Sequence, residues 1–301
     1  MEGISYVKSI KFIDVVKMKY SKEPKTISAQ LDQLKSRGLE VSLEENATHK
    51  LQHIGYYRLS AYMKFFQHKN DQYRVGTDFE DVLNIYAFDR DLKLLLFDAV
   101  ERIEIALRSN MIHFVSVRHG SLWYTDKKLF LDKFDFEKHE RFIIKRISKS
   151  RGNSVFLRHF YKKYSDKYPP AWIFIELLSF GEVLNIFEAL HREERKIIAC
   201  EFDLDEKILI SWMKGLVDIR NTCAHHGRLW NHHIKPPHKH DELELTLNGR
   251  VYDYFLIINF LLAVISPRSQ WTKELSLLIE SNASIPKGAM GFPKNPLKIT
   301  L

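Results

Sequence analysis

The segment DIRNTCAHHGRLWNHH, residues 218–233, holds the densest group of side chains that could do chemistry. It contributes Arg220, Asn221, His225 and His226. An imidazole can move a proton near neutral pH, and a planar guanidinium can hold the negative charge that grows on phosphate oxygens. RNA carries its own nucleophile, the 2′-hydroxyl. These groups would therefore suffice to cleave an RNA phosphodiester without a metal ion.

The stretch before this motif, KILISWMKGLVDI, is amphipathic and predicts a helix over residues 205 to about 226. At about 100° per residue, Asn221 and His225 share a face of that helix, whereas Arg220 and His225 diverge by about 140°. Arg220 and His225 would meet at one phosphate if the helix end unwinds. They would also meet if a second copy of the chain supplies its motif across a twofold interface.

Two other interpretations of this motif stay open. The histidines could simply stabilise the helix C-terminus, which is predicted at Gly227, because the helix dipole favours cations there. The Arg-x4-His spacing also occurs at Arg108 and His113, so that spacing alone is a weak signal. A zinc site is the other interpretation, although the spacing of the candidate ligands is neither His-Glu-x-x-His nor Cys-x2-Cys. The candidate ligands are Cys223, His225, His226, His232, His233, His238 and His240.

Basic residues are concentrated in residues 141–167. This segment holds nine Lys and Arg against one Asp, so its surplus equals the net charge of +8 of the whole chain. Aromatic residues alternate with the cations, as is typical of surfaces that bind single-stranded nucleic acid, although two helices with solvated basic faces would give the same pattern. The residues that we expect to contact RNA are Arg141, Lys145, Arg146, Lys149, Arg151, Arg158, Lys162 and Lys163, with Arg58 and Arg228.

The composition excludes several classes of protein. A content of 45% hydrophobic residues is too high for a disordered chain, and two cysteines are too few for a disulfide scaffold. No apolar run reaches roughly 18 residues, and no Gly-rich nucleotide-binding loop is present. We expect a cytoplasmic protein with no membrane contact, no metal and no cofactor. The five tryptophans are expected mainly in the core, with Trp230, beside the motif, the one to test as a base-stacking residue.

The low content of Gly and Pro and the apolar periodicity predict an all-α fold. A run of about 40 residues from Phe79 should be one long helix or a pair. We divide the chain into an N-terminal helical region (1–75), a helical core (76–265) and an irregular tail (266–301). Further helices are expected at 26–37, 46–66, 136–150, 154–164, 172–178, 184–191, 205–226 and 252–265.

Four separated blocks resemble the Abi-like abortive-infection family, of the AbiD and AbiF type, a branch of the HEPN superfamily. The blocks keep the family order and together span most of the chain. They are IGYYRLSAY (54–62), GTDFEDVLNIYAFDRDLKLLLFDAVERIEIALR (76–108), PPAWIFIELLSFGEV (169–183) and RNTCAHHGRLWN (220–231).

The resemblance implies a HEPN-type helical bundle that works as a homodimer and joins two motifs into one composite endoribonuclease site. Its product would be a 2′,3′-cyclic phosphate. It further implies a toxin-like effector of phage defence that a cognate non-coding RNA binds and neutralises as an antitoxin. The alternative is a non-catalytic, RNA-binding regulatory protein on the same fold.

The family motif assigns roles to individual residues. Arg220 would bind the scissile phosphate, Asn221 would orient it, and His225 would be the acid–base residue, with His226 as the second choice. Arg58 and the pair 101–102 (Glu-Arg) lie in family-like blocks. They would support the motif, bind RNA or form structural ion pairs.

Overall fold

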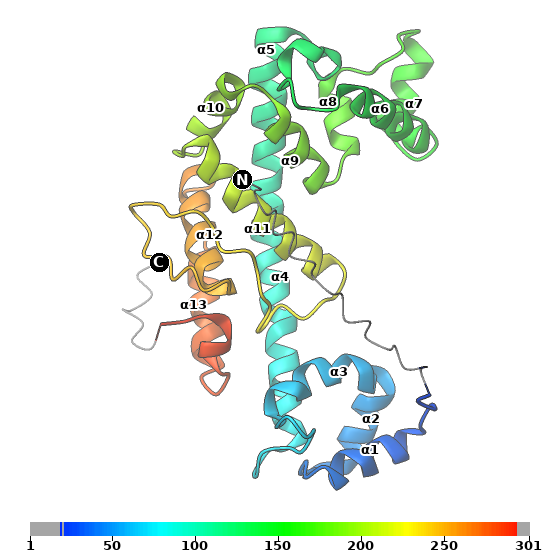
Figure 1. Cartoon of the computed structure of the whole chain (residues 1–301), viewed down its shortest axis with the longest axis vertical. Coiled ribbons are helices and arrows are strands. Elements are labelled where there is room, and N and C mark those ends of the chain that lie inside the picture. Colours follow the sequence, from blue (N-terminus) through cyan, green and yellow to red (C-terminus); the bar gives the residue numbers. More distant parts are fainter. Residues whose placement is uncertain (1–18, 20, 294–301) are drawn as a thin grey trace, which may run out of the picture.

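A computed structural model gives the architecture of residues 19 and 21–293 (Figure 1). Helices make up its regular structure, and within these residues the chain forms isolated β-bridges but no strand. The all-α prediction is therefore confirmed. No helix in this described part is both long enough and apolar enough to cross a membrane.

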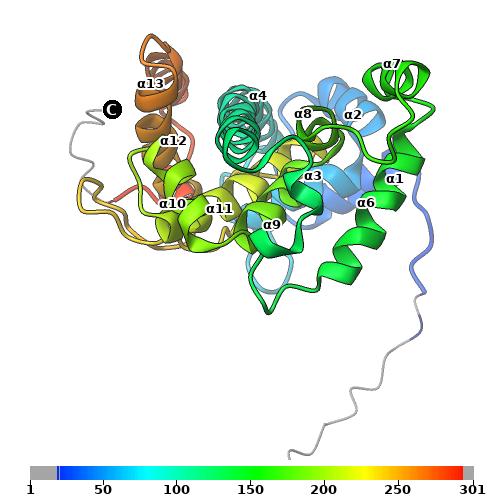
Figure 2. The same ribbon diagram turned by 90° about the horizontal axis from the view of Figure 1, so that it is seen from above.

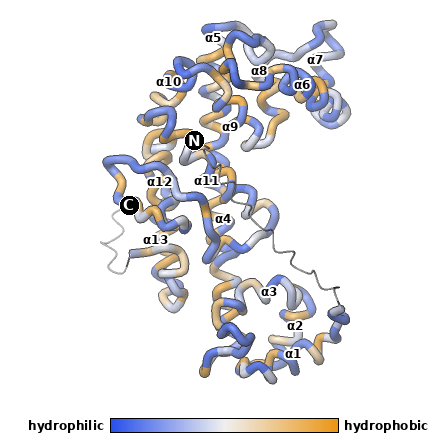
Figure 3. The backbone as a smooth tube through the Cα atoms, viewed as in Figure 1, coloured by the Kyte–Doolittle hydropathy of each residue, from blue (hydrophilic) through white to orange (hydrophobic). Residues whose placement is uncertain are grey.

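The fold is organised around the long helix α4, Phe79–Asn110. Asp78 caps its N-terminus, with Asp81 completing a capping box, and the helix continues through a π-helical turn, Met111–Val115, into α5, Ser116–His119. The run from Phe79 is thus one long helix rather than a pair. Hydrophobic and hydrophilic residues alternate along α4 (Figure 3), as expected for a helix buried on one side.

Three short helices pack at the N-terminal end of α4 (Figure 1). They are α1 (Ile27–Ser36), α2 (Glu44–His53) and α3 (Tyr56–Met63). The single helix expected at 46–66 is divided because Gly55 has a φ of 90°, which lies outside the helical region.

The middle of the chain forms the opposite end of the molecule. It contains α6 (Phe136–Ser150), α7 (Val155–Lys163), α8 (Ala171–Phe174), α9 (Phe180–Ala189) and α10 (Arg192–Cys200). Helix α10 was not predicted, and α9 begins before Gly181 because Ser179 and Glu182 form a capping box there.

The last helices are α11 (Glu206–Ala224), α12 (Val251–Ile265) and α13 (Trp271–Ser281), each of which packs on α4. Seen from above (Figure 2), α12 and α13 lie on one side of α4, and α6 and α7 lie on the other. The prediction of an irregular tail from residue 266 is wrong for α13, because Trp271, Leu275 and Ile279 form a buried stripe that holds this helix in place. Residues 294–301 of that tail lie outside the described residues.

Candidate functional site

The C-terminal end of α11 carries the Arg-Asn-x3-His motif. The helix ends in a Schellman motif, in which the N–H of His226 donates to the Cys223 carbonyl (3.1 Å) and the N–H of Gly227 donates to the Thr222 carbonyl (2.8 Å). His226, with a φ of 57°, takes the left-handed position that glycine usually occupies. The predicted glycine end cap is therefore wrong by one residue. Gly227 is tightly packed, since a Cβ there would lie 3.1 Å from the Thr222 methyl group and would require a small shift of Thr222.

The motif side chains divide between two directions. Asn221, His225 and His226 are exposed at the end of α11, whereas Arg220 is only 30% exposed and pairs with Glu104 of α4, with 3.7 Å between Arg220 Nε and Glu104 Oε2. The structure thus gathers Asn221 and the histidines at one helix end and directs Arg220 toward a neighbouring helix. This divergence agrees with the helical-wheel prediction.

Glu104 links Arg220 to a second, buried arginine. One oxygen of Glu104 pairs with the Arg108 guanidinium, and the other oxygen faces Arg220. Arg108 also donates to the carbonyls of Ile175 (2.6 Å) and Leu178 (2.9 Å). Because these two carbonyls hold Arg108, it fixes Glu104, and Glu104 in turn orients the Arg220 guanidinium.

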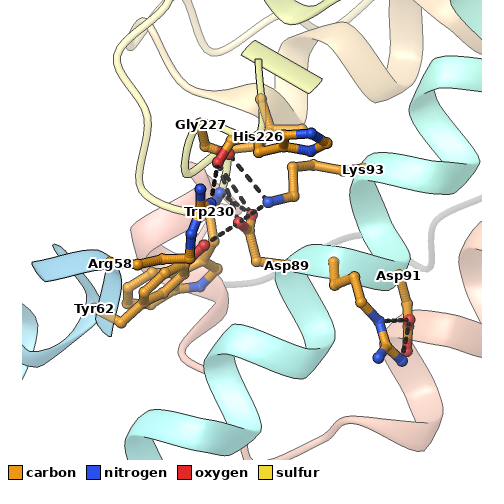
Figure 4. A network of polar contacts seen from close by, with 10 residues as sticks. Arg58, Tyr62, Asp89, Asp91, Lys93, His226, Gly227 and Trp230 are labelled. Carbon is orange, nitrogen blue, oxygen red and sulfur yellow. Dashed lines mark hydrogen bonds and ion pairs between the residues drawn. The ribbon is translucent and has the colours of Figure 1, made fainter. Parts of the chain in front are cut away.

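A fully buried carboxylate, Asp89 of α4, anchors the loop that follows the histidines (Figure 4). It accepts hydrogen bonds from the backbone N–H groups of Leu229 (3.1 Å) and Trp230 (2.5 Å) and from the hydroxyl of Tyr62 (2.6 Å). Lys93, one turn further along α4, lies 3.2 Å from the same carboxylate. Burial and the adjacent Asp89 raise the pKa of Tyr62, so its hydroxyl stays protonated and can donate this hydrogen bond.

Cationic side chains hold the turn itself through its carbonyl groups. Arg58 of α3 donates to the His226 carbonyl (2.8 Å), and Lys93 donates to the Gly227 carbonyl (3.0 Å), so the two reach the turn from opposite sides (Figure 4). Arg228 reaches back to the Ala61 carbonyl of α3. Arg58 and Arg228, which we predicted to contact RNA, therefore have structural partners. Arg102 has a structural partner too, because it donates to Ser269 Oγ (2.9 Å) away from the motif.

Asp89, Lys93 and Glu104 were not singled out from the sequence, although a signal for Asp89 was present. Val82, Ile85, Leu92 and Leu96 form a buried stripe along α4, and Asp89 lies in this stripe between Ile85 and Leu92. A charged residue at a core position of a helix needs buried partners. The position of Asp89 among apolar residues of the helix therefore indicated a structural role.

The remaining candidate ligands of a metal do not converge. Among the residues that the structure describes, no three His, Cys, Asp or Glu side chains form a group that could hold a metal ion. His232 instead pairs with Asp218 of α11, with 3.1 Å between Nε2 and Oδ2. Cys223 is buried, and burial, with a contribution from Asp89, raises its pKa to about 12.

The basic segment 141–167 forms α6, α7 and the loop after them. Its predicted RNA contacts are exposed, with one exception: Arg146 is half-buried and pairs with Glu182, which also caps α9. Arg146 therefore joins α6 to α9. The exposed members are Arg141, Lys145, Lys149, Arg151, Arg158, Lys162 and Lys163.

The tryptophans reverse one expectation. Trp230 is fully buried beside Phe65, with 4.8 Å between ring centroids, so its ring has no free face for a base. Trp172, at the start of α8, is 52% exposed, whereas Trp123, Trp212 and Trp271 are buried. Four of the five tryptophans thus lie in the core as predicted, and the exception is Trp172 rather than Trp230.

Comparison with protein-family models gives a match to "Abi-like protein" over residues 49–231. The match covers more than half of the chain and includes α3, α4 and the whole of the motif on α11. Searches of curated proteins and of solved structures give no match. By the extent of the family match, the chain belongs to the Abi-like protein family.

Proposed function

We propose that this protein is an abortive-infection endoribonuclease of phage defence whose site is the end of α11. The observation that carries the proposal is the geometry of the motif. Asn221 and His225 are exposed at a helix end that Asp89 and Lys93 hold rigid, and Arg220 is oriented by Glu104. All of these residues lie within the family match. Preorganised cationic and acid–base groups of this kind suit a phosphodiester substrate.

The chemistry that we propose is transesterification. The 2′-oxygen of the substrate attacks the adjacent phosphorus as an imidazole accepts the 2′-hydroxyl proton, and a P–O2′ bond forms. The P–O5′ bond breaks, and a second proton donor protonates the leaving 5′-oxygen. Arg220 neutralises the charge on the non-bridging oxygens, and Asn221 orients the phosphate. The products are a 2′,3′-cyclic phosphate and a 5′-hydroxyl.

A second copy of the chain would supply the second proton donor and complete the site. Exposed residues Leu94, Phe97, Glu101 and Ile105 recur every three to four residues and so form one mainly apolar face of α4. Glu104, the partner of Arg220, borders this face. A twofold contact through α4 would cover the apolar side chains and bring two motifs together.

RNA is the partner that we propose for the exposed cations of the basic segment. A surplus confined to one segment of the chain suits a polyanion, and both a substrate RNA and a neutralising non-coding RNA present the same phosphates. Arg146, Arg58 and Arg228 have carboxylate or carbonyl partners within the chain, and Arg141 lies 3.8 Å from Glu137, so the RNA-binding assignment is strongest for the other cations.

The test is cleavage of a labelled single-stranded RNA by purified protein, with mapping of the new 3′ ends. We expect His225→Ala and Arg220→Ala to lose at least about 100-fold in rate, the usual loss for an acid–base or charge-stabilising group. The matched control is His113→Ala, an exposed histidine with the same spacing from Arg108. Equal cleavage by wild type and the His225→Ala variant would refute the assignment.

The composite site has its own test. An equal mixture of Arg220→Ala and His225→Ala proteins should cleave faster than either alone, because mixed dimers combine an intact arginine with an intact histidine. Leu94→Glu with Ile105→Glu should give monomers in light scattering, whereas Val75→Glu, at a fully exposed position elsewhere, should not. Monomeric wild-type protein with full activity would refute the dimer.

A further inference from the structure

We infer that a groove beside α7, distinct from the motif on α11, binds the unpaired bases of single-stranded RNA. The groove consists of two adjacent hollows of about 380 and 490 Å³, within the usual ~300–1,000 Å³ range of ligand pockets. They share one wall, formed by Tyr164, Asp166 and Tyr168. This inference rests on the proposed function for the identity of the ligand, RNA, and adds the place where its bases bind.

The first hollow lies between α7 and the start of α8 and offers aromatic surface. Trp172 lines it together with Phe160 and His159. Trp172 is 52% exposed and Tyr164 is 46% exposed, whereas the other tryptophans are buried. A tryptophan left half-exposed in the wall of a hollow has a free face on which a base can stack.

The second hollow lies between α6 and the loop after α7 and adds cations to the aromatic wall. The Arg151 guanidinium lies 4.4 Å from the centroid of the Tyr161 ring, and Lys167 Nζ lies 4.7 Å from that of Tyr168. Both cations line this hollow. Cations held over aromatic faces can bind phosphates at the rim while bases occupy the hollow.

The charges indicate which part of a nucleotide enters. Asp166, the single acid of the basic segment, lies in the shared wall and would repel a phosphate there. The exposed Lys162 and Lys163 end α7 directly before Tyr164 and do not line the hollows, so they can bind the RNA backbone beside the groove. Bases of a duplex are stacked on one another and hidden, so the groove selects unpaired RNA.

Trp172 also provides a direct readout. A collisional quencher such as iodide reaches Trp172 and not the four buried tryptophans, so quenching of the native protein reports on this residue. We expect a single-stranded RNA of about 15 nucleotides to protect Trp172 from iodide, and the same sequence in a duplex not to do so. The His225→Ala protein serves for these titrations, because its RNA stays uncleaved if the proposed function holds.

Fluorescence anisotropy with the same RNA gives the affinity. Trp172→Ala should weaken single-strand binding by about 5- to 150-fold, the usual contribution of one stacked base, and Trp172→Phe should retain most of it. The control is Tyr57→Ala, which removes a 91% exposed aromatic ring from α3. Far-UV circular dichroism of each variant checks that the fold is kept.

The outcomes separate this inference from the proposed function. If Trp172→Ala binds single-stranded RNA as well as wild type and RNA leaves iodide quenching unchanged, the groove assignment is overturned while RNA binding stands. If neither the single strand nor the duplex binds or protects Trp172, the inference fails together with the proposed RNA partner. If RNA binds and protects Trp172 but is never cleaved, the groove stands and the nuclease assignment fails.

Discussion

Replacement of Asp89 by Asn tests the proposed anchoring of the motif loop. The carboxylate receives three hydrogen bonds, from Leu229, Trp230 and Tyr62, and it neutralises Lys93. An amide of the same shape keeps one acceptor oxygen but presents an NH₂ group in place of the other. At least one donor then loses its acceptor, and a lysine that is only 12% exposed loses its counter-ion.

The expected loss of stability follows from these contacts. An unsatisfied buried donor costs about 1–3 kcal/mol, and breaking a buried ion pair costs about 3–5 kcal/mol. Because the two effects share one site and do not add fully, we expect a loss of about 3–5 kcal/mol in the free energy of unfolding. A typical domain has only about 5–15 kcal/mol in total.

Urea unfolding followed by circular dichroism measures this loss, and α4 supplies the control. Asp91 lies two residues away and pairs with Arg90 on the surface (Figure 4), so Asp91→Asn should change stability by less than about 0.5 kcal/mol. A second substitution, Lys93→Met, should recover part of the Asp89→Asn loss, because it removes the unpaired charge. If Asp89→Asn and Asp91→Asn unfold at the same urea concentration, the anchoring argument is refuted.

Further predictions follow from the conformation and the pKa of single residues. His226→Gly should raise the free energy of unfolding by up to about 1 kcal/mol in urea titration, because glycine accepts the left-handed φ of this position. This variant should still cleave RNA if His225 is the acid–base residue, and it should lose cleavage if His226 is. Alkylation at pH 8 should label the exposed Cys200 quickly and Cys223 slowly, since a pKa of about 12 leaves roughly one Cys223 in 10⁴ ionised; mass spectrometry showing equal labelling would contradict this. Burial lowers the pKa of His139 below its ordinary 6.5, so the unfolded chain binds the proton more tightly and stability should fall as pH drops below about 6.5; His139→Gln should reduce that fall in thermal unfolding.

The sequence predicted helices well where apolar residues recur over a long stretch of the chain. Helices α4 and α11 were predicted because burial along one face dictates their apolar spacing, whereas α12 was predicted as an apolar run that is buried on several faces. Helix α10 was missed because its first turns are charged (REERK), and α13 was missed because the Pro-rich stretch after it suggested a tail. Contacts with other elements stabilise both helices: α10 packs on α11, and α13 packs on α4 through its stripe of Trp271, Leu275 and Ile279.

The motif could also be found in the sequence, but the residues that hold its side chains in place could not. Spacing within one helix predicted the divergence of Arg220 from His225, because both residues belong to the same regular element. Glu104 is more than 100 residues from Arg220 in the chain, and no local pattern links the two. Trp172 was assigned to the core for a related reason: hydropathy records the residue type and not which face of a short helix is covered.

The contacts around the motif favour one of the two routes that we propose for bringing Arg220 and His225 together. Unwinding of the α11 end would have to release the Arg58 and Lys93 bonds to the turn and the Asp89 bonds just beyond it. The Asp89 bonds to Leu229 and Trp230 are buried, and the loss of each would cost about 1–3 kcal/mol, so unwinding carries at least two such costs. Association through the exposed face of α4 would break none of these bonds and would bury apolar surface. We therefore propose a second copy as the less costly way to complete the site, because one copy alone would have to break the network that holds its own motif.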